Sequence, residues 1–191
     1  MRLFVGIPLD EEARRGVERI VKKLKRGHWP VRWEKAEKWH VTLAFLGDDK
    51  RDLDSLSRLS SAVRKGVREI KAFEVGFKGL GAFPDWFLPR IVWMGLKGDL
   101  KSMGRMYKKV REELEKKGFE FDRKPFRGHI TLGRVKKDAK RKHRLELGKY
   151  LKKQRELEIP QKWLVDRVVI YESELGSEGS GYKVIEEVRL V

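Results

Sequence analysis

Two periodicities of hydrophobic and polar residues along the chain predict its helices and strands. Apolar stripes with a period of 3.6 residues predict helices over residues 10–26, 52–70 and 100–117, and a poorer stripe predicts one over 138–153. Alternating or continuously apolar runs predict strands over residues 2–7, 31–34, 39–46, 72–80, 90–96, 128–135, 164–172 and 182–191, with a loop at 176–181. Several of these strands follow one another directly, as in hairpins. The pattern therefore favours an α+β fold with mainly antiparallel sheets and helices outside.

The chain also contains a coarse internal repeat. The strands predicted at 39–46 and 128–135 carry the same short motif, and each leads into a basic helix. Two lobes related by a pseudo-twofold axis are the simplest explanation of such a repeat. Residues 1–191 are therefore expected to form a single two-lobed domain.

The repeated motif contains the only two threonines of the chain. Thr42 lies two residues after His40 in the sequence His-Val-Thr-Leu, and Thr131 lies two residues after His129 in His-Ile-Thr-Leu. Side chains alternate between the two faces of a strand. Each histidine should therefore share a face with its threonine, above a packed apolar back.

The same alternation predicts where the neighbours of the motifs point. Phe45 should lie on the face opposite His40, and Arg134 on the face opposite His129. Arg127, two residues before His129, has the parity to share its face. Arg134 reaches that face only if a twist or bulge shifts the alternation. Both arginines are candidates for binding substrate. Strand alternation favours Arg127, whereas Arg134 can bind only if a bulge turns it to the same face as His129.

Two imidazoles and two hydroxyls around one centre are a sufficient set for phosphoryl transfer. One histidine can act as general base and the other as general acid, while the threonines donate hydrogen bonds to the non-bridging phosphate oxygens. A single His-x-Thr pair is more often an ordinary sheet face, but two identical pairs favour catalysis. The chain has no cysteine and no P-loop, zinc-ligand, EF-hand or dinucleotide-binding pattern, so neither a metal nor a cofactor is predicted.

The charge of the chain indicates a polyanionic partner. The sequence has 46 Lys and Arg against 29 Asp and Glu, a net charge of +17, which attracts nucleic acid. A high charge without Asn or Cys also fits adaptation to high temperature, although ion-pair networks do not explain an excess of one sign. The basic run at 134–144 has two interpretations, an RNA-backbone contact or a solvated helix face.

The remaining aromatic residues and histidines carry weaker signals. Trp29, Trp33, Trp39 and the aromatic loop at 83–87 either stack on unpaired bases or pack within the fold. His28 lies in a turn-like stretch and His143 in a basic run, and neither has a threonine two residues later. Both are expected to be solvated.

The two motifs and their flanks resemble the RNA 2',3'-cyclic phosphodiesterases, also called 2'-5' RNA ligases, of the two-histidine phosphoesterase superfamily. The resemblance rests on Trp-His-Val-Thr-Leu-Ala-Phe-Leu-Gly at 39–47 and Gly-His-Ile-Thr-Leu-Gly-Arg at 128–134. It extends to Pro-Arg-Ile-Val-Trp at 89–93, Tyr-Glu-Ser at 171–173 and Gly-Tyr at 181–182. It therefore covers nearly the whole chain.

This resemblance implies a bilobal fold whose two motif strands face each other across a central cleft. It also implies metal-independent hydrolysis of RNA 2',3'-cyclic phosphate ends to 2'-phosphates, and 2'-5' RNA ligation as a further activity. In such enzymes the histidine matching His40 is the proton donor to the leaving O3', and the one matching His129 is the proton acceptor that activates water. Thr42 and Thr131 are the accompanying catalytic and substrate-binding residues. Arg134 is similar to the arginine that often closes the second motif, as either a phosphate-side or a structural residue.

A second class of function is a basic RNA-binding module whose cleft holds phosphate without turnover. The presence of both complete motifs favours the enzyme, because a binding module does not need both imidazoles. The chain lacks a signal-peptide pattern and a long apolar stretch, so a cytoplasmic protein without membrane association is expected. The expected state is a monomer, and the expected partner is RNA with 2',3'-cyclic phosphate ends.

Overall fold

The computed structural model describes residues 2–48, 53–121, 125–176 and 179–191. Within these ranges the helices are α1 (Glu11–Lys25), η1 (Ala36–Lys38, a 3-10 turn), α2 (Leu53–Val67), α3 (Leu100–Lys116) and α4 (Arg141–Lys153). The strands are β1 (Arg2–Pro8), β2 (Val31–Trp33), β3 (His40–Asp48), β4 (Phe73–Phe83), β5 (Ile91–Gly98), β6 (His129–Val135), β7 (Glu158–Val165), β8 (Arg167–Gly176) and β9 (Gly179–Arg189). The four predicted helices are confirmed within three residues at each end.

The strands form a mainly antiparallel sheet in the order β7-β4-β5-β6-β3-β1-β8-β9, with β2 beside β6. The predicted α+β class is therefore confirmed. We call the half with β3, β1, β8 and β9 the first lobe, and the half with β6, β5, β4 and β7 the second lobe. The lobes join where β3 pairs with β6, through Val41 and Ile130. Each motif strand thus lies at the centre of the sheet and begins one lobe.

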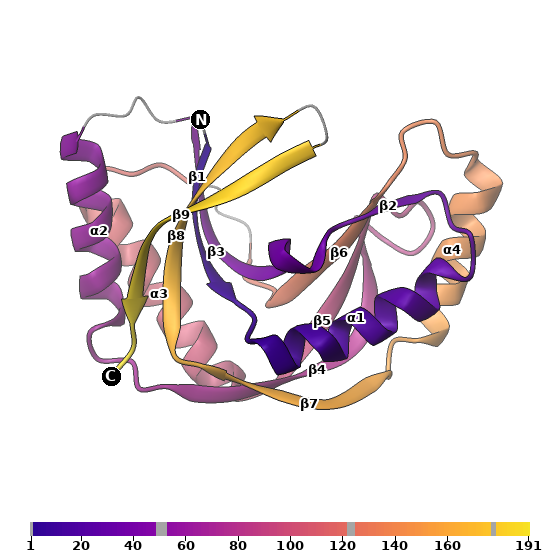
Figure 1. Cartoon of the computed structure of the whole chain (residues 1–191), viewed down its shortest axis with the longest axis horizontal. Helices are drawn as coiled ribbons and strands as arrows, with labels where there is room; N and C mark the ends of the chain where they lie inside the picture. The colour runs from indigo at the N-terminus through magenta and orange to yellow at the C-terminus, as the bar shows by residue number, and fades with distance from the viewer. Residues whose placement is uncertain (1, 49–52, 122–124, 177–178) are drawn as a thin grey trace.

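The helices cover the two lobes in pairs (Figure 1). Helices α2 and α3 pack on each other and contact β9 and β3 of the first lobe, whereas α1 and α4 contact β7 and β4 of the second. The stripe predicted over 10–26 is the buried face of α1, formed by Ala13, Val17, Ile20, Val21 and Leu24. Helix α1 follows β1 of the first lobe but covers the second, so the lobes exchange elements. None of the described helices is long and apolar enough to cross a membrane.

The strand predicted over 164–172 is confirmed as β8 from residue 167 onward, but its first two residues belong to another strand. It spans the end of β7 and the start of β8, which are separated at Asp166. Strand β7 pairs with β4 in the second lobe and β8 pairs with β1 in the first, so the chain changes lobe at this residue. Apolar residues continue on both sides of Asp166, and the sequence pattern therefore hides the break. The predicted loop at 176–181 is shorter than expected: β8 runs to Gly176, β9 begins at Gly179, and 177 and 178 lie outside the described residues.

Candidate active site

A cleft of about 970 Å³ lies between the two lobes, and both motifs line it. Its walls contain all six residues singled out from the sequence, namely His40, Thr42, Arg127, His129, Thr131 and Arg134. They come from the paired centre of the sheet and from the segment that precedes β6. Residues separated by nearly half the chain therefore meet in one cavity.

The pairing of β3 with β6 explains how the motifs meet. Val41 and Ile130 are paired and fully buried, so the residues on either side of them point to the other face, into the cleft. Antiparallel register places His40 beside Thr131, and Thr42 beside His129. Each histidine thus has a threonine on its own strand and another across the pair.

The alternation along β3 changes just after its motif. Strand β1 pairs Gly6 with Thr42 but Val5 with Ala44, so Leu43 is the extra residue of a bulge. The bulge turns Phe45 to the cleft, where its side chain is 48% exposed. The prediction that Phe45 lies opposite His40 is therefore wrong.

Strand β6 has a bulge at the matching position. Strand β5 pairs Trp93 with Thr131 but Val92 with Gly133, so Leu132 is the extra residue. Arg134 consequently lies on the cleft face and not opposite His129 as simple alternation predicts. Its guanidinium Nε lies 3.4 Å from a carboxylate oxygen of Glu34, which also lines the cleft. The bulge required for Arg134 to reach the cleft is present.

Backbone carbonyls orient both imidazoles in the same way. His40 Nδ1 donates to the carbonyl of Lys38 at 2.7 Å, and His129 Nδ1 donates to the carbonyl of Arg127 at 2.6 Å. This bond fixes the tautomer, since the proton on Nδ1 leaves the lone pair on Nε2. The Thr42 hydroxyl lies 3.1 Å from His40 Nε2 and can donate to it. In both histidines Nε2 is therefore the ring nitrogen that is left to accept a proton.

The profile of the 2'-5' RNA ligase superfamily matches residues 8–177. The chain belongs to this superfamily. A curated relative from Thermotoga maritima, named RNA 2',3'-cyclic phosphodiesterase, is 33% identical over 98% of this chain and 94% of its own length. Another of that name, from Archaeoglobus fulgidus, is 37% identical over 72% of this chain and 74% of its own length.

Solved structures resemble this superfamily member over the whole chain. A crystal structure from Thermus thermophilus has a TM-score of 0.80 and 26% identity, covering 100% of this chain and 98% of its own. The apo form of LigT from Escherichia coli has a TM-score of 0.74 and 22% identity, covering 99% of this chain and 96% of its own, and supports the fold alone.

The surroundings of the two histidines lower their proton affinity unequally. The pKa of His40 is lowered from its ordinary 6.5 to about 4. Burial is the main cause, the hydrogen bond to the Lys38 carbonyl opposes it, and the charges of His129 and Arg134 add to it. Burial also lowers the pKa of His129, to a smaller extent. Without an anion in the cleft, the first proton therefore goes to His129.

Aromatic rings form the wall around His40. The Phe4 ring lies 4.8 Å from the imidazole between centroids, and the Tyr182 ring meets it edge-on at 5.4 Å. Gly6 makes room for the imidazole, because a Cβ there would lie 3.1 Å from His40 Cδ2. The corresponding wall at His129 is made by Phe83, at 5.0 Å, and Trp93, at 6.0 Å.

Several cleft residues were not singled out as site residues from the sequence: Glu34, Lys38, Arg90, Tyr107 and Arg111. Glu34, Lys38 and Arg90 lie on separate segments, whereas Tyr107 and Arg111 lie one turn apart on α3, and the five residues have no common motif. Lys38 and Arg127 each precede a motif histidine by two residues, and this equal spacing is the signal that could have found Lys38. Among the described residues, no cluster of three or more His, Asp or Glu could hold a metal ion.

Most of the tryptophans pack within the fold. Trp39 is 3% exposed, and Trp29, Trp33 and Trp86 are partly buried against the core. The stacking interpretation is therefore wrong for Trp39. His28 and His143 are exposed, as predicted.

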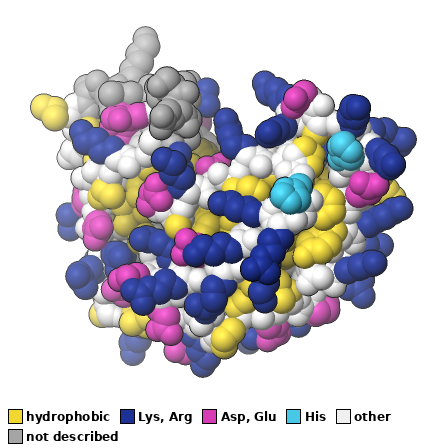
Figure 2. Space-filling model, turned by 45° about the vertical axis from the view of Figure 1, so that its right-hand side comes forward, with side chains coloured by type: hydrophobic (Ala, Val, Ile, Leu, Met, Phe, Trp, Pro, Cys, Tyr) yellow, Lys and Arg dark blue, Asp and Glu magenta, His cyan; other side chains and the backbone are white. Residues whose placement is uncertain are grey.

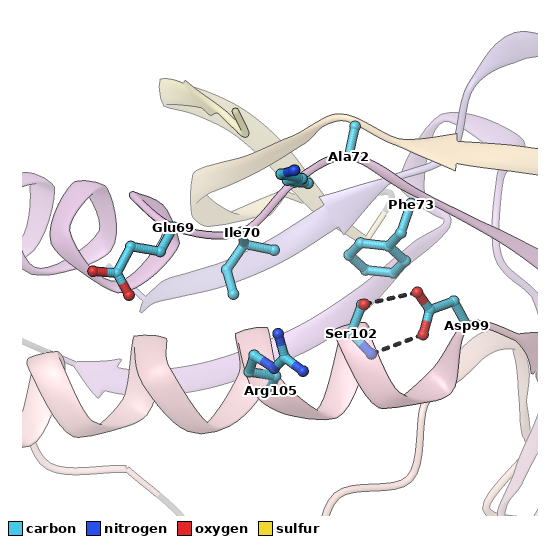
Figure 3. A pocket seen from close by; sticks show the side chains of 8 residues that line it. Glu69, Ile70, Ala72, Phe73, Asp99, Ser102 and Arg105 are labelled. Carbon is cyan, nitrogen blue, oxygen red and sulfur yellow. Dashed lines mark hydrogen bonds between the residues drawn. The ribbon is translucent and has the colours of Figure 1, made fainter.

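A smaller hollow of about 350 Å³ lies beside the first turn of α3 (Figure 3). Asp99 at its edge accepts hydrogen bonds from the backbone N–H of Ser102 at 2.9 Å and from its hydroxyl at 2.7 Å. The carboxylate thereby caps α3. Glu69, Lys71 and Arg105 also line the hollow, but no histidine does, so it lacks the paired imidazoles of the cleft.

Proposed function

We propose that the chain hydrolyses RNA 2',3'-cyclic phosphate ends to 2'-phosphates by acid-base catalysis without a metal ion. The 2'-5' ligation of RNA would open the same cyclic phosphate with the 5'-hydroxyl of a second RNA in place of water: the bond from phosphorus to O3' breaks and a 2'-5' linkage forms. The observation that carries this proposal is the pair of imidazoles whose Nε2 atoms face one cleft, each fixed by a carbonyl two residues earlier. The names of the curated relatives give it independent support.

In the proposed reaction the cyclic phosphate lies between the two motifs. His129 Nε2 takes a proton from a water molecule as the water oxygen forms a bond to phosphorus. The bond from phosphorus to O3' breaks, and His40 Nε2–H gives its proton to O3'. The product is a 2'-phosphate with a free 3'-hydroxyl, and the two histidines return to their starting states by exchanging protons with solvent.

Bound phosphate has a defined part in this mechanism. His40 must be protonated to act as donor, yet its pKa in the empty cleft is about 4. A phosphate anion beside Nε2 favours the charged imidazolium and raises this pKa. The same anion attracts the Thr42 hydroxyl away from Nε2. The substrate thereby prepares the acid that it needs.

The other cleft residues stabilise the negative charge of the phosphate. Thr42 and Thr131 donate hydrogen bonds to its non-bridging oxygens, and Arg134 and Arg127 supply positive charge. Glu34 limits where the Arg134 side chain can point through their ion pair. No metal ion is needed for charge stabilisation in this arrangement.

The test is an assay of purified protein with an oligoribonucleotide that ends in a 2',3'-cyclic phosphate. We expect a 2'-phosphate product, and we expect the rate to survive dialysis against EDTA. A rate that EDTA abolishes and a divalent ion restores would contradict the metal-independent mechanism. Tight binding of the oligonucleotide without any product would instead identify a phosphate-binding module.

A further inference from the structure

The net charge of the molecule is concentrated around α4. Residues 134–155 contain eleven Lys and Arg against two acidic residues, Asp138 and Glu146, and so carry a net charge of +9 out of the chain's +17. Of the exposed cations of this stretch, Arg134 and Arg155 form ion pairs with Glu34 and Glu156. The other exposed cations are Lys136, Lys137, Lys140, Arg141, Lys142, Lys149, Lys152 and Lys153, which we call the basic track. Lys and Arg side chains outnumber acidic ones on the face that includes the α4 side (Figure 2).

The cations of the basic track differ from those of the other helices. Ion pairs four residues apart neutralise part of the charge on α1 (Arg15 with Glu11), on α2 (Arg58 with Asp54) and on α3 (Lys108 with Glu112). In the part of the chain that the structure describes, no cation of the basic track forms an ion pair. Ion-pair networks that serve thermal stability would neutralise α4 in the same way as the other helices. The track therefore remains available to an external polyanion.

The basic track continues out of the cleft. Arg134 lies in the cleft at the end of β6, and the track begins two residues later. Arg144 of α4 donates to the carbonyls of Lys136 at 3.2 Å and Lys137 at 3.1 Å, which ties the helix to this exit. An RNA chain whose end lies between the motifs can therefore leave over a surface of unneutralised positive charge.

An exposed aromatic ring lies on a loop that runs from the cleft to α4. Phe87 is 72% exposed in the loop 84–88, which follows the cleft residue Phe83. Asp85 holds the loop by accepting hydrogen bonds from the backbone N–H groups of Phe87 at 2.8 Å and Leu88 at 2.9 Å. The loop also packs on α4, because a Cβ on Gly148 would lie 1.6 Å from the Trp86 carbonyl oxygen. Phe87 is therefore exposed on a loop that is held by the hydrogen bonds to Asp85 and by packing on α4.

We propose that the basic track and Phe87 form a binding site for the single-stranded RNA that precedes the cyclic phosphate end. This proposal rests on the proposed function for the identity of the bound end. The lysines and arginines contact the phosphates, and the Phe87 ring stacks on an unpaired base. An unpaired base is needed because a duplex keeps both faces of its bases stacked. The site would thus extend substrate recognition beyond the nucleotide that reacts.

The test compares two variants that each lose four positive charges. The track variant replaces Lys142, Lys149, Lys152 and Lys153 by Gln, and the control replaces the exposed Lys71, Lys101, Lys108 and Lys117 on the α2 and α3 side by Gln. Binding of a single-stranded oligoribonucleotide of about eight residues, ending in a 3'-phosphate, is measured by fluorescence anisotropy at several salt concentrations. Turnover is measured with a 2',3'-cyclic mononucleotide.

We expect the track variant to bind the oligoribonucleotide on the order of ten-fold more weakly at low salt, with a salt slope reduced by roughly two to three. The control variant should change both quantities much less. Phe87→Ala should weaken binding by on the order of ten-fold with an unchanged salt slope. All three should keep the wild-type rate on the cyclic mononucleotide, which touches only the cleft.

The outcomes separate this proposal from the proposed function. Equal losses of affinity in the track and control variants would overturn the track, since only the overall charge would then matter. Full affinity in Phe87→Ala, or equal losses for single-stranded and duplex RNA, would overturn the stacking contact. Absence of turnover on the cyclic mononucleotide in the wild-type protein would refute the proposed function. The anisotropy data would still show whether the basic track binds single-stranded RNA.

Discussion

The two motif strands are built alike. In both β3 and β6 the histidine Nδ1 donates to the carbonyl two residues earlier, at 2.7 and 2.6 Å. Both strands carry a bulge one residue after the threonine, at Leu43 and Leu132. The repeated sequence therefore encodes a repeated local geometry that directs both Nε2 atoms to the same cleft.

The surroundings of the two strands are not alike. The residue that the bulge turns into the cleft is Phe45 on β3 but Arg134 on β6. His40 is the more deeply enclosed imidazole and feels the positive charge of Arg134, so its pKa falls to about 4, whereas that of His129 falls less. The comparison teaches that the motif sets where each histidine points, and that its neighbours set when it holds a proton.

The sharpest test of the comparison is removal of each histidine. His40→Ala and His129→Ala should each lower kcat on a cyclic phosphate by ~10²- to 10⁴-fold, because each removes a positioned acid or base. Circular dichroism of both variants checks that the fold is kept. Near-normal turnover by either variant would falsify the two-histidine mechanism.

A change of leaving group then distinguishes the two roles within the same pair of variants. A phosphodiester with an acidic phenol in the O3' place does not need a proton donor, so it should restore much of the His40→Ala rate and little of the His129→Ala rate. Preferential rescue of His129→Ala would reverse the roles, in agreement with the order of proton affinities in the empty cleft.

The next test removes the charge that distinguishes β6 from β3. Arg134→Gln should lower kcat/KM on the order of 10- to 100-fold, because a charged donor to the phosphate is lost. It should also raise the pKa of His40 above about 4, since Arg134 lowers it. NMR titration of the imidazole signals measures the second effect. Lys101→Gln removes one charge far from the cleft, and an equal change in that variant would contradict a local role of Arg134.

A smaller effect is expected from the threonines. Thr42→Ala and Thr131→Ala should each lower kcat by ~10-fold, since each loses one hydrogen bond to phosphate. Thr42→Ala should in addition change the titration of His40, because only Thr42 contacts a histidine Nε2 in the described residues. Steady-state rates and NMR titration of the two variants make the comparison. Identical titration curves would mean that the hydrogen bond from Thr42 has no influence on proton affinity.

The smallest expected effect is a displacement of the pH profile. In the free enzyme the pKa values of both imidazoles are lowered, so kcat/KM should fall with rising pH from a point below 6.5, where the last imidazole proton is lost. Bound phosphate raises the pKa of His40, so the falling limb of kcat should lie at higher pH. Initial rates on a cyclic mononucleotide give both profiles. If kcat and kcat/KM fall over the same pH range, bound phosphate leaves the proton affinity of His40 unchanged.

The sequence by itself determined the helices, most strands and the pairing of each histidine with its threonine. These features follow from local periodicity, because a stripe every 3.6 residues or an alternation of two specifies which side chains share a face. Even the meeting of His40 with His129 was predictable, since the same unusual motif occurs twice. The resemblance of the flanking residues supplied the expected roles.

Only the tertiary structure decided which neighbours join the site. Bulges at Leu43 and Leu132 brought Phe45 and Arg134 into the cleft, and alternation alone cannot reveal a bulge because it depends on pairing with β1 and β5. The change of lobe at Asp166 likewise depends on which partner strand is available. The low pKa of His40 follows from burial by residues distant in sequence, such as Phe4 and Tyr182. Proton affinity is a property of the assembled cleft, and no local pattern in the chain contains it.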